Sequence, residues 1–411
     1  MSAPAPETRP RSLFARVFSL DLLDNRYAPL HGLRVLAIVS VVQYHVTAIL
    51  AVEEKLPLDK DFVSSSLAVF FGMDLFFLLS GFLIGSILLR AFEVPLPGST
   101  TPRPNRGVGM IRRFYLRRAF RTFPSYWVVL TVLASVTALT PMQRHNLPYE
   151  YAYLTNFFLL TRTGVVMLWG WSLALEEQFY LVVPFLFLIL NRLRSDRARV
   201  LLLVALFFAA LATRVIIYLS HHGPWGDLEI YGALYFRTHT RYDTLIAGIL
   251  LALVHNRWQG AIGRWLTHPF NRALLLLPSL GCFWFLARPW MFGEKYLQLV
   301  HLFMWGTITS IMYFAWLLIL LQGDGWIHRA LSLPFFRRVA TVGYGVYLVH
   351  IPVCDRFIVP FSRALMARHV SAPLVWVASL VALLVASHAI AYVIHIVIEK
   401  PSLWLRDRFA G

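Results

Sequence analysis

Long apolar runs alternate with short basic segments over most of the chain. Ten of these runs are long enough to approach or cross about 30 Å of hydrocarbon as helices. They occupy residues 33–52, 66–90, 123–140, 177–191, 199–220, 242–255, 272–291, 298–321, 339–360 and 372–398. The pattern predicts an all-α fold: a polytopic integral membrane helical bundle with about ten transmembrane helices.

The expected number of spans is uncertain by about one. The runs at 177–191 and 242–255 are short for crossing a bilayer. The segment YAYLTNFFLL, residues 151–160, is an eleventh candidate that either re-enters the membrane or lies at its surface.

Composition agrees with a membrane protein. Hydrophobic residues make up 58% of the chain, charged residues only 14%, and the mean hydropathy is +0.62, beyond ordinary soluble domains. The Pro- and Arg-rich start lacks a signal peptide, so residues 1–26 are expected to form a disordered cytosolic tail. Residues 27–405 then form one membrane domain, and residues 406–411 a short cytosolic C-terminus. Cys282 and Cys354 lie inside apolar runs, which supports neither a disulfide scaffold nor a metal site.

Charge follows the positive-inside rule. With the N-terminus inside, the cytosolic segments carry 25 of the 38 Lys and Arg residues, and the outer loops with their borders carry 11. Both termini are therefore expected in the cytosol. Because the basic residues are spread over many loops, the net charge of +17 reports topology and does not indicate nucleic-acid binding.

An arginine and a histidine share the first apolar run, LRVLAIVSVVQYH. Arg34 and His45 are eleven residues apart, so on a helix they lie on one face, about 16 Å apart along the axis. Arg34 then lies near the cytosolic mouth and His45 near the middle of the bilayer. Taken alone, such a His is more often a helix–helix hydrogen-bonding residue, and such an Arg a snorkelling anchor.

Further ionisable residues in apolar surroundings favour a functional interpretation. Each costs about 2.5–3.5 kcal/mol at a helix centre unless it faces a polar cavity or a partner. They are Asp74, Glu176, Glu177, Asp243, His350 and Glu399. Together they predict an internal cavity. The alternative for some of them is an ion pair, Arg241 with Asp243 or Glu399 with Lys400, and for Glu399 we favour the ion pair.

A basic motif, FYLRRAFRTFPSYW at residues 114–127, follows the second run on the predicted cytosolic side. Arg113, Arg117 and Arg121 recur at every fourth position and line one helix face, with Arg118 on a neighbouring face. Such a stripe suits a polyanion bound through bidentate contacts; a basic helix lying on anionic lipid is an equal alternative. Pro124 predicts a break between this helix and the next.

Seven motifs together resemble the acyltransferase 3 family of integral membrane acyltransferases. They are LRVLAIVSVVQYH, GMDLFFLLSGFLIG, FYLRRAFRTFPSYW, WSLALEEQFYL, RYDTLIAGILLA, YGVYLVHIP and IEKP, in the family's order and at roughly its spacing, over residues 27–405. Each motif alone is weak, but seven in order are specific. The resemblance implies a bundle of about ten helices that moves an acyl group, usually acetyl from cytosolic acetyl-CoA, to a hydroxyl of a carbohydrate or similar acceptor.

The resemblance also implies roles for individual residues. The family's Arg and His signature falls on Arg34 and His45, which with Glu176 and Glu177 form the candidate catalytic set. The basic motif assigns acyl-CoA binding to Arg117, Arg118 and Arg121, with Arg113. The candidate substrate-cavity residues are Asp74, Tyr126, Arg241, Asp243, Tyr347 and His350. Some relatives continue into an extracytoplasmic hydrolase-like domain, whereas this chain stops at Gly411, so a stand-alone transferase is expected.

The chemistry also follows from the residues. Transfer from a thioester to an alcohol needs a base, and imidazole, with a pKa near 6.5, suits neutral pH, which makes His45 the candidate base. A carboxylate such as Glu177 could orient the ring, and at most one of the adjacent Glu176 and Glu177 is expected to face it. The arginines would hold the CoA phosphates. An acyl-histidine intermediate is an alternative to direct transfer.

The function predicted is O-acylation of a carbohydrate acceptor in the cell envelope, at a bacterial inner membrane. The donor is acetyl-CoA, or a longer or acidic acyl-CoA such as succinyl-CoA. Surface polysaccharide, lipopolysaccharide, periplasmic glucan, peptidoglycan and a macrolide-type glycoside all remain open as acceptors. The alternative class is a transporter or flippase of a lipid-linked sugar; the lack of an internal repeat and the Arg-rich motif weigh against it.

Overall fold

The structure is a computed structural model that describes residues 20, 23–68, 72–92, 108–158, 161–222, 227–287, 295–323 and 325–409. Within these ranges every regular element is a helix. Most of the tail predicted at residues 1–26 lies outside the described residues, as do residues 410 and 411 of the predicted C-terminus.

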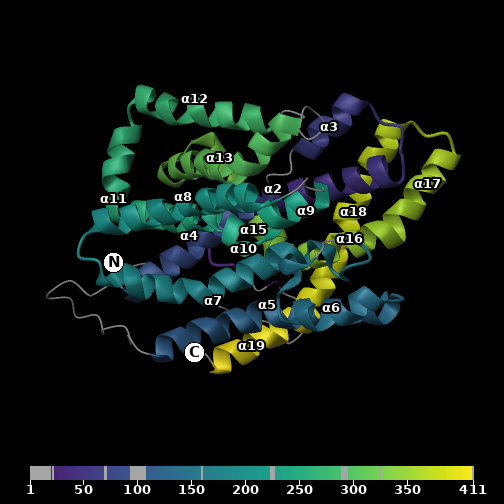
Figure 1. Ribbon diagram of the computed structural model, residues 1–411, viewed down its shortest axis with the longest axis horizontal. Helices are drawn as coiled ribbons and strands as arrows, with labels where there is room; N and C mark the ends of the chain where they lie inside the picture. The colour runs from purple at the N-terminus through teal and green to yellow at the C-terminus, as the bar shows by residue number, and fades with distance from the viewer. Residues whose placement is uncertain are drawn as a thin grey trace, which may run out of the picture.

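The helices follow one another with short connections (Figure 1). In chain order they are α2 (Pro29–Thr47), η1 (Ala48–Glu53), α3 (Lys60–Ala68), α4 (Gly72–Phe92), α5 (Val108–Val136), α6 (Pro141–Tyr151), η3 (Thr155–Phe157), η4 (Leu168–Gly170), α7 (Trp171–Arg192), α8 (Asp196–Ser220), α9 (Asp227–Tyr231), η5 (Gly232–Phe236), α10 (Thr238–Arg241), α11 (Asp243–Leu266), α12 (Pro269–Leu286), α13 (Lys295–Gln322), α14 (Trp326–Leu331), α15 (Pro334–Thr341), α16 (Gly343–Val353), η7 (Cys354–Ile358), α17 (Val359–Ala367), α18 (Ala372–Ile394), η8 (His395–Glu399) and α19 (Lys400–Phe409).

The number of membrane spans agrees with the prediction. Across the described ranges, nine helices are long and apolar enough to cross a membrane, and the pair Pro334–Thr341 and Gly343–Ala367, bent by 60°, makes a tenth if it counts as one span. Each of the ten apolar runs overlaps one of these spans. The all-α membrane bundle is therefore confirmed.

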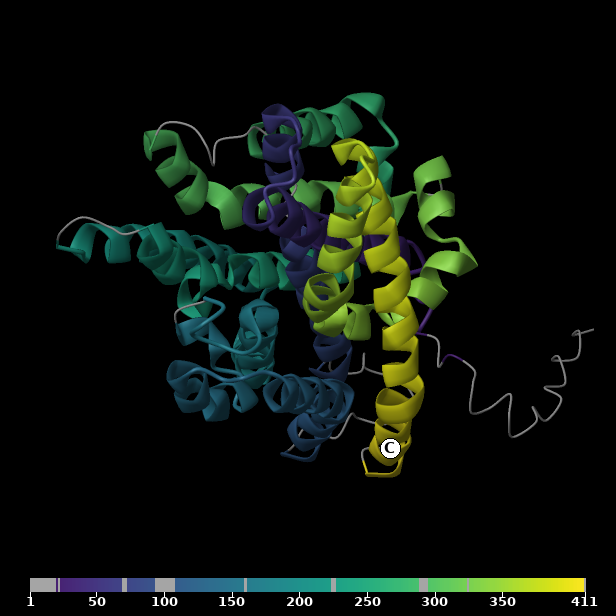
Figure 2. The ribbon, with the colours of Figure 1, turned by 90° about the vertical axis from the view of Figure 1, so that its right-hand side faces the viewer.

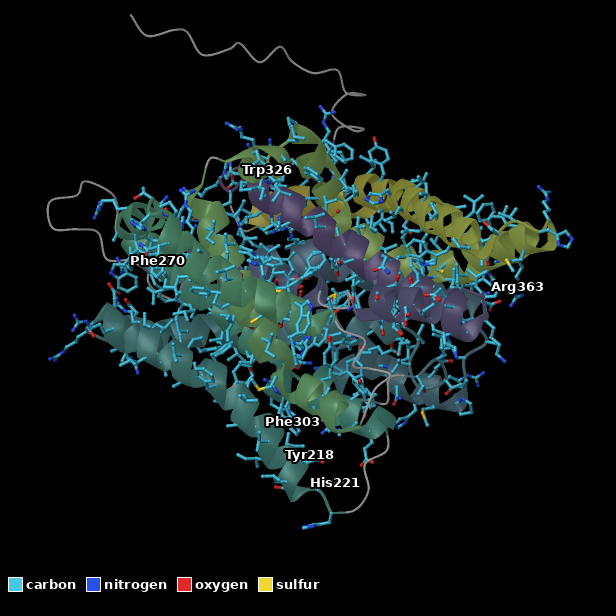
Figure 3. The ribbon with its side chains drawn as sticks, turned by 90° about the horizontal axis from the view of Figure 1, so that it is seen from above. Tyr218, His221, Phe270, Phe303, Trp326 and Arg363 are labelled. Atoms are coloured by element: carbon cyan, nitrogen blue, oxygen red, sulfur yellow. The ribbon has the colours of Figure 1, made fainter. Side chains whose placement is uncertain are left out.

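The spans form a bundle with α4 and α11 at its centre (Figure 1). Helices α12 and α13 cover one flank, and α5 with α19 covers the opposite flank. Helices α18 and α19 continue into one another as a long rod along the bundle (Figure 2). Seen from above, Tyr218 of α8 and Phe303 of α13 meet edge to face, with ring centroids 5.1 Å apart (Figure 3).

Two glycines let α4 and α11 approach closely. A Cβ atom on Gly81 would lie 2.1 Å from the carbonyl oxygen of Leu245, and one on Gly248 would lie 2.3 Å from that of Leu78. Neither distance is compatible with a real side chain. Small residues at such crossings allow backbone contact between membrane helices, where lipid provides little hydrophobic drive for association.

The predicted break at Pro124 is wrong, because α5 runs without interruption from Val108 to Val136. A proline inside a helix removes the hydrogen bond to the carbonyl four residues earlier, here that of Phe120. The hydroxyl of Ser402 donates to this oxygen at 2.5 Å. A partner from α19 thus satisfies the group that Pro124 leaves open, and the arginine motif forms the first half of a membrane span.

The segment proposed as an eleventh span, at 151–160, is not a helix of its own in its described part. Helix α6 ends at Tyr151, and only a turn and the short η3 follow. The carboxylate of Glu150, at the end of α6, accepts hydrogen bonds from the backbone N–H groups of Val166 at 2.7 Å and Met167 at 2.9 Å. Burial raises the pKa of Glu150, and these donors oppose the shift. They tie the loop before α7 to α6.

The helix crossing provides a stability test. Gly248→Ala should destabilise the protein by about 1–3 kcal/mol, because the added methyl group overpacks the contact with Leu78. Gly281→Ala on α12 is the matched control, since nothing lies within 4 Å of its added Cβ. Thermal unfolding in detergent measures both. Equal melting temperatures for the two variants would contradict the close-packing account.

Candidate active site

Two histidines from distant parts of the chain meet inside the bundle. The Nδ1 atom of His45, on α2, lies 3.1 Å from Nε2 of His350, on α16, and the ring centroids are 4.9 Å apart. His350 is fully buried, whereas His45 keeps part of its surface accessible. The tyrosine before it, Tyr44, packs edge to face on the His45 ring.

The hydrogen bonds assign the tautomers of both rings. Nδ1 of His350 lies 2.7 Å from the carbonyl oxygen of Tyr347, and Nδ1 of His45 lies 2.9 Å from that of Val41. A carbonyl only accepts, so each Nδ1 carries a hydrogen. Nε2 of His350 is then an acceptor, and it receives the shared Nδ1–H of His45. His45 is left with a lone pair on Nε2, for which the described residues offer no hydrogen-bond partner.

A carboxylate, a phenol and a hydroxyl form a second cluster between α4 and α7. Ser80 and Tyr180 both donate to the same oxygen, Oε1, of Glu176. The Ser80 and Tyr180 hydroxyl oxygens are themselves 2.6 Å apart. The guanidinium of Arg118 lies over the Tyr180 ring, 5.2 Å from its centroid. This contact connects the cluster to the basic motif of α5.

Three of the predicted arginines converge near this cluster. Arg34 on α2 interacts electrostatically with Arg121 and Arg118 of α5, and also with Glu176. Arg113 and Arg117 lie on the same helix with exposed side chains. Carboxylates lie among these groups, since Glu399 acts electrostatically on Arg121 as Glu176 does on Arg34. Planar guanidinium groups are suited to bidentate phosphate binding.

The two adjacent glutamates have different surroundings, as their positions on a helix require. Glu177 lies within hydrogen-bonding reach of Thr122 on α5 and interacts electrostatically with Arg118. Tyr344 of α16 donates to the Thr122 carbonyl at 3.0 Å. In the described structure the ring of His45 is therefore oriented by Val41 and His350, and neither glutamate has a direct hydrogen bond to it.

Two buried ion pairs connect α4, α8, α11 and the segment before α11. Asp74 Oδ1 lies 2.7 Å from Nη2 of Arg241, and Asp243 Oδ2 lies 2.9 Å from Nη1 of Arg214. The alternative pairing of Arg241 with Asp243 is thus not the hydrogen-bonded one. Gly306 allows the second pair, because a Cβ there would lie 2.4 Å from Asp243 Oδ2.

Donors from α13 and aromatic rings complete these pairs. Trp305 donates to Asp74 Oδ2 at 2.6 Å, and Arg214 donates to the Thr307 hydroxyl at 3.2 Å. The Arg241 guanidinium lies 4.5 Å from the centroid of the Tyr235 ring. That cation–π contact accounts for the Arg241 nitrogens Nε and Nη1, which have no hydrogen-bond acceptor.

The remaining candidates each have hydrogen-bond partners inside the bundle. The hydroxyl of Tyr347 donates to the Trp169 carbonyl at 2.8 Å and lies 2.5 Å from Ser172 Oγ. Tyr126 is fully buried and donates to the Glu150 carbonyl at 3.0 Å. Glu399 Oε2 lies 2.7 Å from Nδ1 of His395, one turn earlier on η8.

The predicted outer end of the site carries an arginine held by two acids. Arg162 contacts Asp355 at 2.7 Å and Glu53 at 3.0 Å. The hydrogen bond that Arg162 donates to Asp355 raises the pKa of Arg162, so its charge is fixed. Arg162 also acts electrostatically on His45. Among the residues that the structure describes, no group of three or more His, Cys, Asp or Glu side chains is placed to hold a metal ion.

Sequence reasoning missed several members of these clusters. They are Ser80, Arg162, Tyr180, Arg214 and Trp305. Ser80 and Arg214 carried a signal, since each is a polar residue in an apolar run. Trp305 and Arg162 carried none, because an aromatic residue in a span and a charge in a loop are both common.

An all-helical bundle with a histidine pair and an arginine–carboxylate cluster inside it defines a polytopic membrane protein with a polar interior. Residues 27–395 match the model of the acyltransferase 3 family, described as an acyltransferase domain. The chain belongs to this family of integral membrane acyltransferases.

Two bacterial relatives show where the similarity extends. "Peptidoglycan O-acetyltransferase OatA" of Listeria monocytogenes is 25% identical over 367 residues, covering 80% of this chain and 50% of the relative. "Putative peptidoglycan O-acetyltransferase YrhL" of Bacillus subtilis is 27% identical over 348 residues, covering 80% of this chain and 49% of the relative. The chain thus spans about half the length of both relatives. No solved structure matches it.

Breaking the Asp74–Arg241 pair tests its role. Asp74→Asn should lower stability by about 3–5 kcal/mol, because it leaves Arg241 buried without its counter-ion. The double variant Asp74→Leu with Arg241→Met should recover much of the loss. Glu54→Gln, which removes the acid from a pair with the exposed Arg363, is the control with little expected effect. Melting temperatures of the variants in detergent provide the measurement. An unchanged melting temperature for Asp74→Asn would refute the stabilising role of the Asp74–Arg241 pair.

Proposed function

We propose that the protein is an O-acetyltransferase that moves an acetyl group from cytosolic acetyl-CoA to a hydroxyl of an envelope glycan. The observation that carries the proposal is the free Nε2 of His45, on the helix whose other end brings Arg34 to the arginines of the predicted cytosolic side. The family match and the acetyltransferase names of the relatives support the reaction class. Peptidoglycan is the acceptor that we propose first, on the relatives' names.

In the proposed reaction His45 is the general base. The acceptor hydroxyl gives its proton to Nε2 while its oxygen attacks the thioester carbonyl carbon. The carbon–sulfur bond then breaks, the ester is complete, and Nε2 returns the proton to the CoA thiolate. The reaction consumes one thioester and one alcohol and produces one ester and one thiol.

His350 acts through His45 and is a positioning residue. Its Nε2 accepts from Nδ1 of His45, which holds the ring orientation and stabilises the imidazolium that forms when Nε2 takes a proton. In a Ser–His–Asp triad an aspartate does this. Here the third group is a neutral imidazole whose own tautomer is fixed by the Tyr347 carbonyl.

The donor is proposed to bind at the arginine cluster. Arg118, Arg121 and Arg34 supply planar guanidinium groups suited to the phosphates of CoA. Bound there, the pantetheine arm would extend along α2, on the helix face that Arg34 shares with His45. Binding of the phosphates would thus deliver the thioester to the base, and the effective concentration gained by such positioning lowers the barrier.

The protein is proposed to lie in the bacterial inner membrane with both termini in the cytosol. With the bent pair counted as one span, the described residues hold ten spans, which would bring both ends to the same side, and the distribution of Lys and Arg favours the cytosol. Side-chain contacts agree with a topology in which successive spans cross the membrane in opposite directions. Glu53, Arg162 and Asp355, which meet in the structure, all fall at ends predicted to face outward. The acceptor would reach His45 from that end.

Donor binding gives one test. Arg118→Gln with Arg121→Gln should weaken acetyl-CoA binding by about 3–6 kcal/mol in sum, because each lost charged contact costs about 1.5–3 kcal/mol. Arg329→Gln, an exposed arginine of α14, is the control. Calorimetry on purified protein in detergent provides the measurement. If acetyl-CoA binds the double variant and the control equally well, the cluster is only a lipid-facing surface.

The histidine pair gives a second test. His45→Gln should slow transfer by about 10²- to 10⁴-fold. His350→Leu should lower kcat by about tenfold or more with KM nearly unchanged, while His350→Gln should keep most activity, since its amide oxygen can accept from Nδ1 of His45.

His388→Gln is the matched control, because His388 also bonds the carbonyl four residues earlier on its helix, at 2.7 Å. Transfer of radiolabelled acetyl to glycan fragments is the assay. Transfer by His45→Gln within about tenfold of the parent would remove the catalytic role. Equal losses in the two His350 variants would remove the positioning role.

A further inference from the structure

A tryptophan outside the predicted site contacts the helix that carries His350. Trp169 is only 5% exposed and lies in η4, shortly before α7. Its indole N–H donates to the carbonyl of Leu348 at 3.2 Å, and its own carbonyl accepts from the Tyr347 hydroxyl at 2.8 Å. Its ring also meets the His350 ring edge to face, with centroids 6.3 Å apart. Trp169 therefore contacts three residues of one turn of α16, including the partner of His45.

The acceptor of the indole is a carbonyl that α16 itself leaves open. In a regular α-helix the Leu348 carbonyl would accept from the N–H of residue 352, but Pro352 has no N–H. A carbonyl freed by a proline inside a membrane bundle is satisfied by a neighbouring group. The indole of Trp169 supplies this donor. The bond therefore serves the break in α16 that lies two residues after His350.

Backbone bonds hold the segment that carries Trp169. The Glu150 carboxylate of α6 accepts from the backbone N–H groups of Val166 and Met167. The Met167 carbonyl accepts from the N–H of Gly170 at 2.8 Å. The chain is thus held on both sides of Trp169, and the indole reaches α16 from a backbone that is tied to α6.

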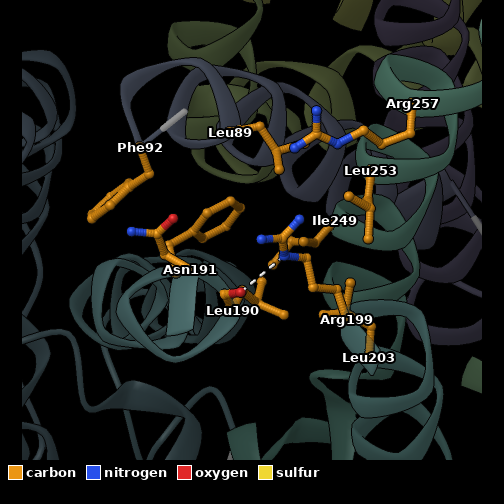
Figure 4. Close-up of a pocket in the computed structure, with 10 residues that line it drawn as sticks. Leu89, Phe92, Leu190, Asn191, Arg199, Leu203, Ile249, Leu253 and Arg257 are labelled. Carbon is orange, nitrogen blue, oxygen red and sulfur yellow. Dashed lines mark hydrogen bonds between the residues drawn. The ribbon is translucent and has the colours of Figure 1, made fainter. Parts of the chain in front are cut away.

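Trp169 is not one of the residues that line the pocket between α4, α7, α8 and α11 (Figure 4). The residues drawn there come from these four helices and include Leu89, Phe187, Leu203 and Leu253, one from each. The contacts of Trp169 are with protein groups of α16. They indicate a role in holding that helix rather than in lining this pocket.

We propose that Trp169 is a positioning residue that holds His350 opposite His45, an inference that rests on the proposed function of the histidine pair. Helices bend at prolines, so the bond to Leu348 limits how far the turn that carries His350 bends at Pro352. Nε2 of His350 lies 3.1 Å from Nδ1 of His45, and such a bond weakens steeply when its angle falls. Without the indole donor, His45 would lose its orienting partner, whereas the binding of donor and acceptor would be unchanged.

Removing the indole donor and then replacing it from within α16 gives the test. Trp169→Phe keeps an aromatic ring but loses the N–H. It should lower kcat about tenfold with KM nearly unchanged, because a displaced His350 no longer orients the base. Pro352→Ala adds a backbone N–H that reaches the Leu348 carbonyl. The double variant, Trp169→Phe with Pro352→Ala, should therefore recover most of the lost kcat.

Trp316→Phe is the matched control. The Trp316 indole N–H donates to Oγ of Ser279 at 2.9 Å, between α13 and α12, so this variant loses the same donor elsewhere in the bundle. It should keep the kcat and KM of the parent. Transfer of radiolabelled acetyl to glycan fragments measures both constants. Equal kcat values for Trp169→Phe and Trp316→Phe, or a double variant no more active than Trp169→Phe, would overturn the positioning role.

Nitrogen-15 NMR of the full-length protein, labelled at histidine, provides a readout that does not depend on transfer. The His350→Gln variant identifies the His350 signals. In Trp169→Phe the Nε2 signal of His350 should move toward that of a nitrogen without a hydrogen bond, and adding Pro352→Ala should move it back. An unmoved signal in Trp169→Phe would overturn the proposal.

The same spectra separate this inference from the proposed function. If the parent transfers no acetyl, the proposed function fails, and the His350 signals alone decide whether Trp169 holds that ring. If Trp169→Phe does not fold, the double variant carries the test, because Pro352→Ala restores the missing donor. A folded double variant with the His350 signals of the parent is then expected. An unfolded double variant, or one with displaced His350 signals, would overturn the proposal.

Discussion

A polar group inside a membrane bundle must find a partner, and this constraint organises the protein. The Asp74–Arg241 and Asp243–Arg214 pairs are fully buried, and their remaining bonds reach Trp305 and Thr307 on α13. An unpaired charge there would cost several kcal/mol. The pairs therefore fix the relative rotation of α4, α8, α11 and α13, and the glycine crossing of α4 and α11 fixes their separation.

The side chains that have no partner in the buried ion pairs include the ones suited to catalysis and donor binding. Glu176 is occupied by Ser80 and Tyr180, and His350 by Tyr347 and His45. By contrast, Nε2 of His45 keeps its lone pair. Arg34 interacts electrostatically with Arg118 and Arg121 as well as with Glu176, and the guanidinium groups repel one another. An anionic thioester would relieve this repulsion, which is why we place the donor at that end of α2.

The sequence was sufficient for the spans, because a hydrophobic run long enough to cross a bilayer has few other uses. It also proposed His45 and the arginines as candidates, which stay predictions. It could not give the pairings, since these depend on how helices rotate against one another. His350 contacts His45, which lies 305 positions earlier in the sequence. Ser402 donates to the Phe120 carbonyl that Pro124 leaves without a partner, and these two residues are 282 positions apart. No local pattern records either contact.

The account depends most on the protonation of one ring, which nitrogen-15 NMR can read directly in protein labelled at histidine. The His45→Gln variant identifies the signals. The account predicts that His45 carries its hydrogen on Nδ1 and a lone pair on Nε2. A His45 ring with the hydrogen on Nε2 and Nδ1 bare would contradict it, because the atom assigned to accept the acceptor's proton would already hold one.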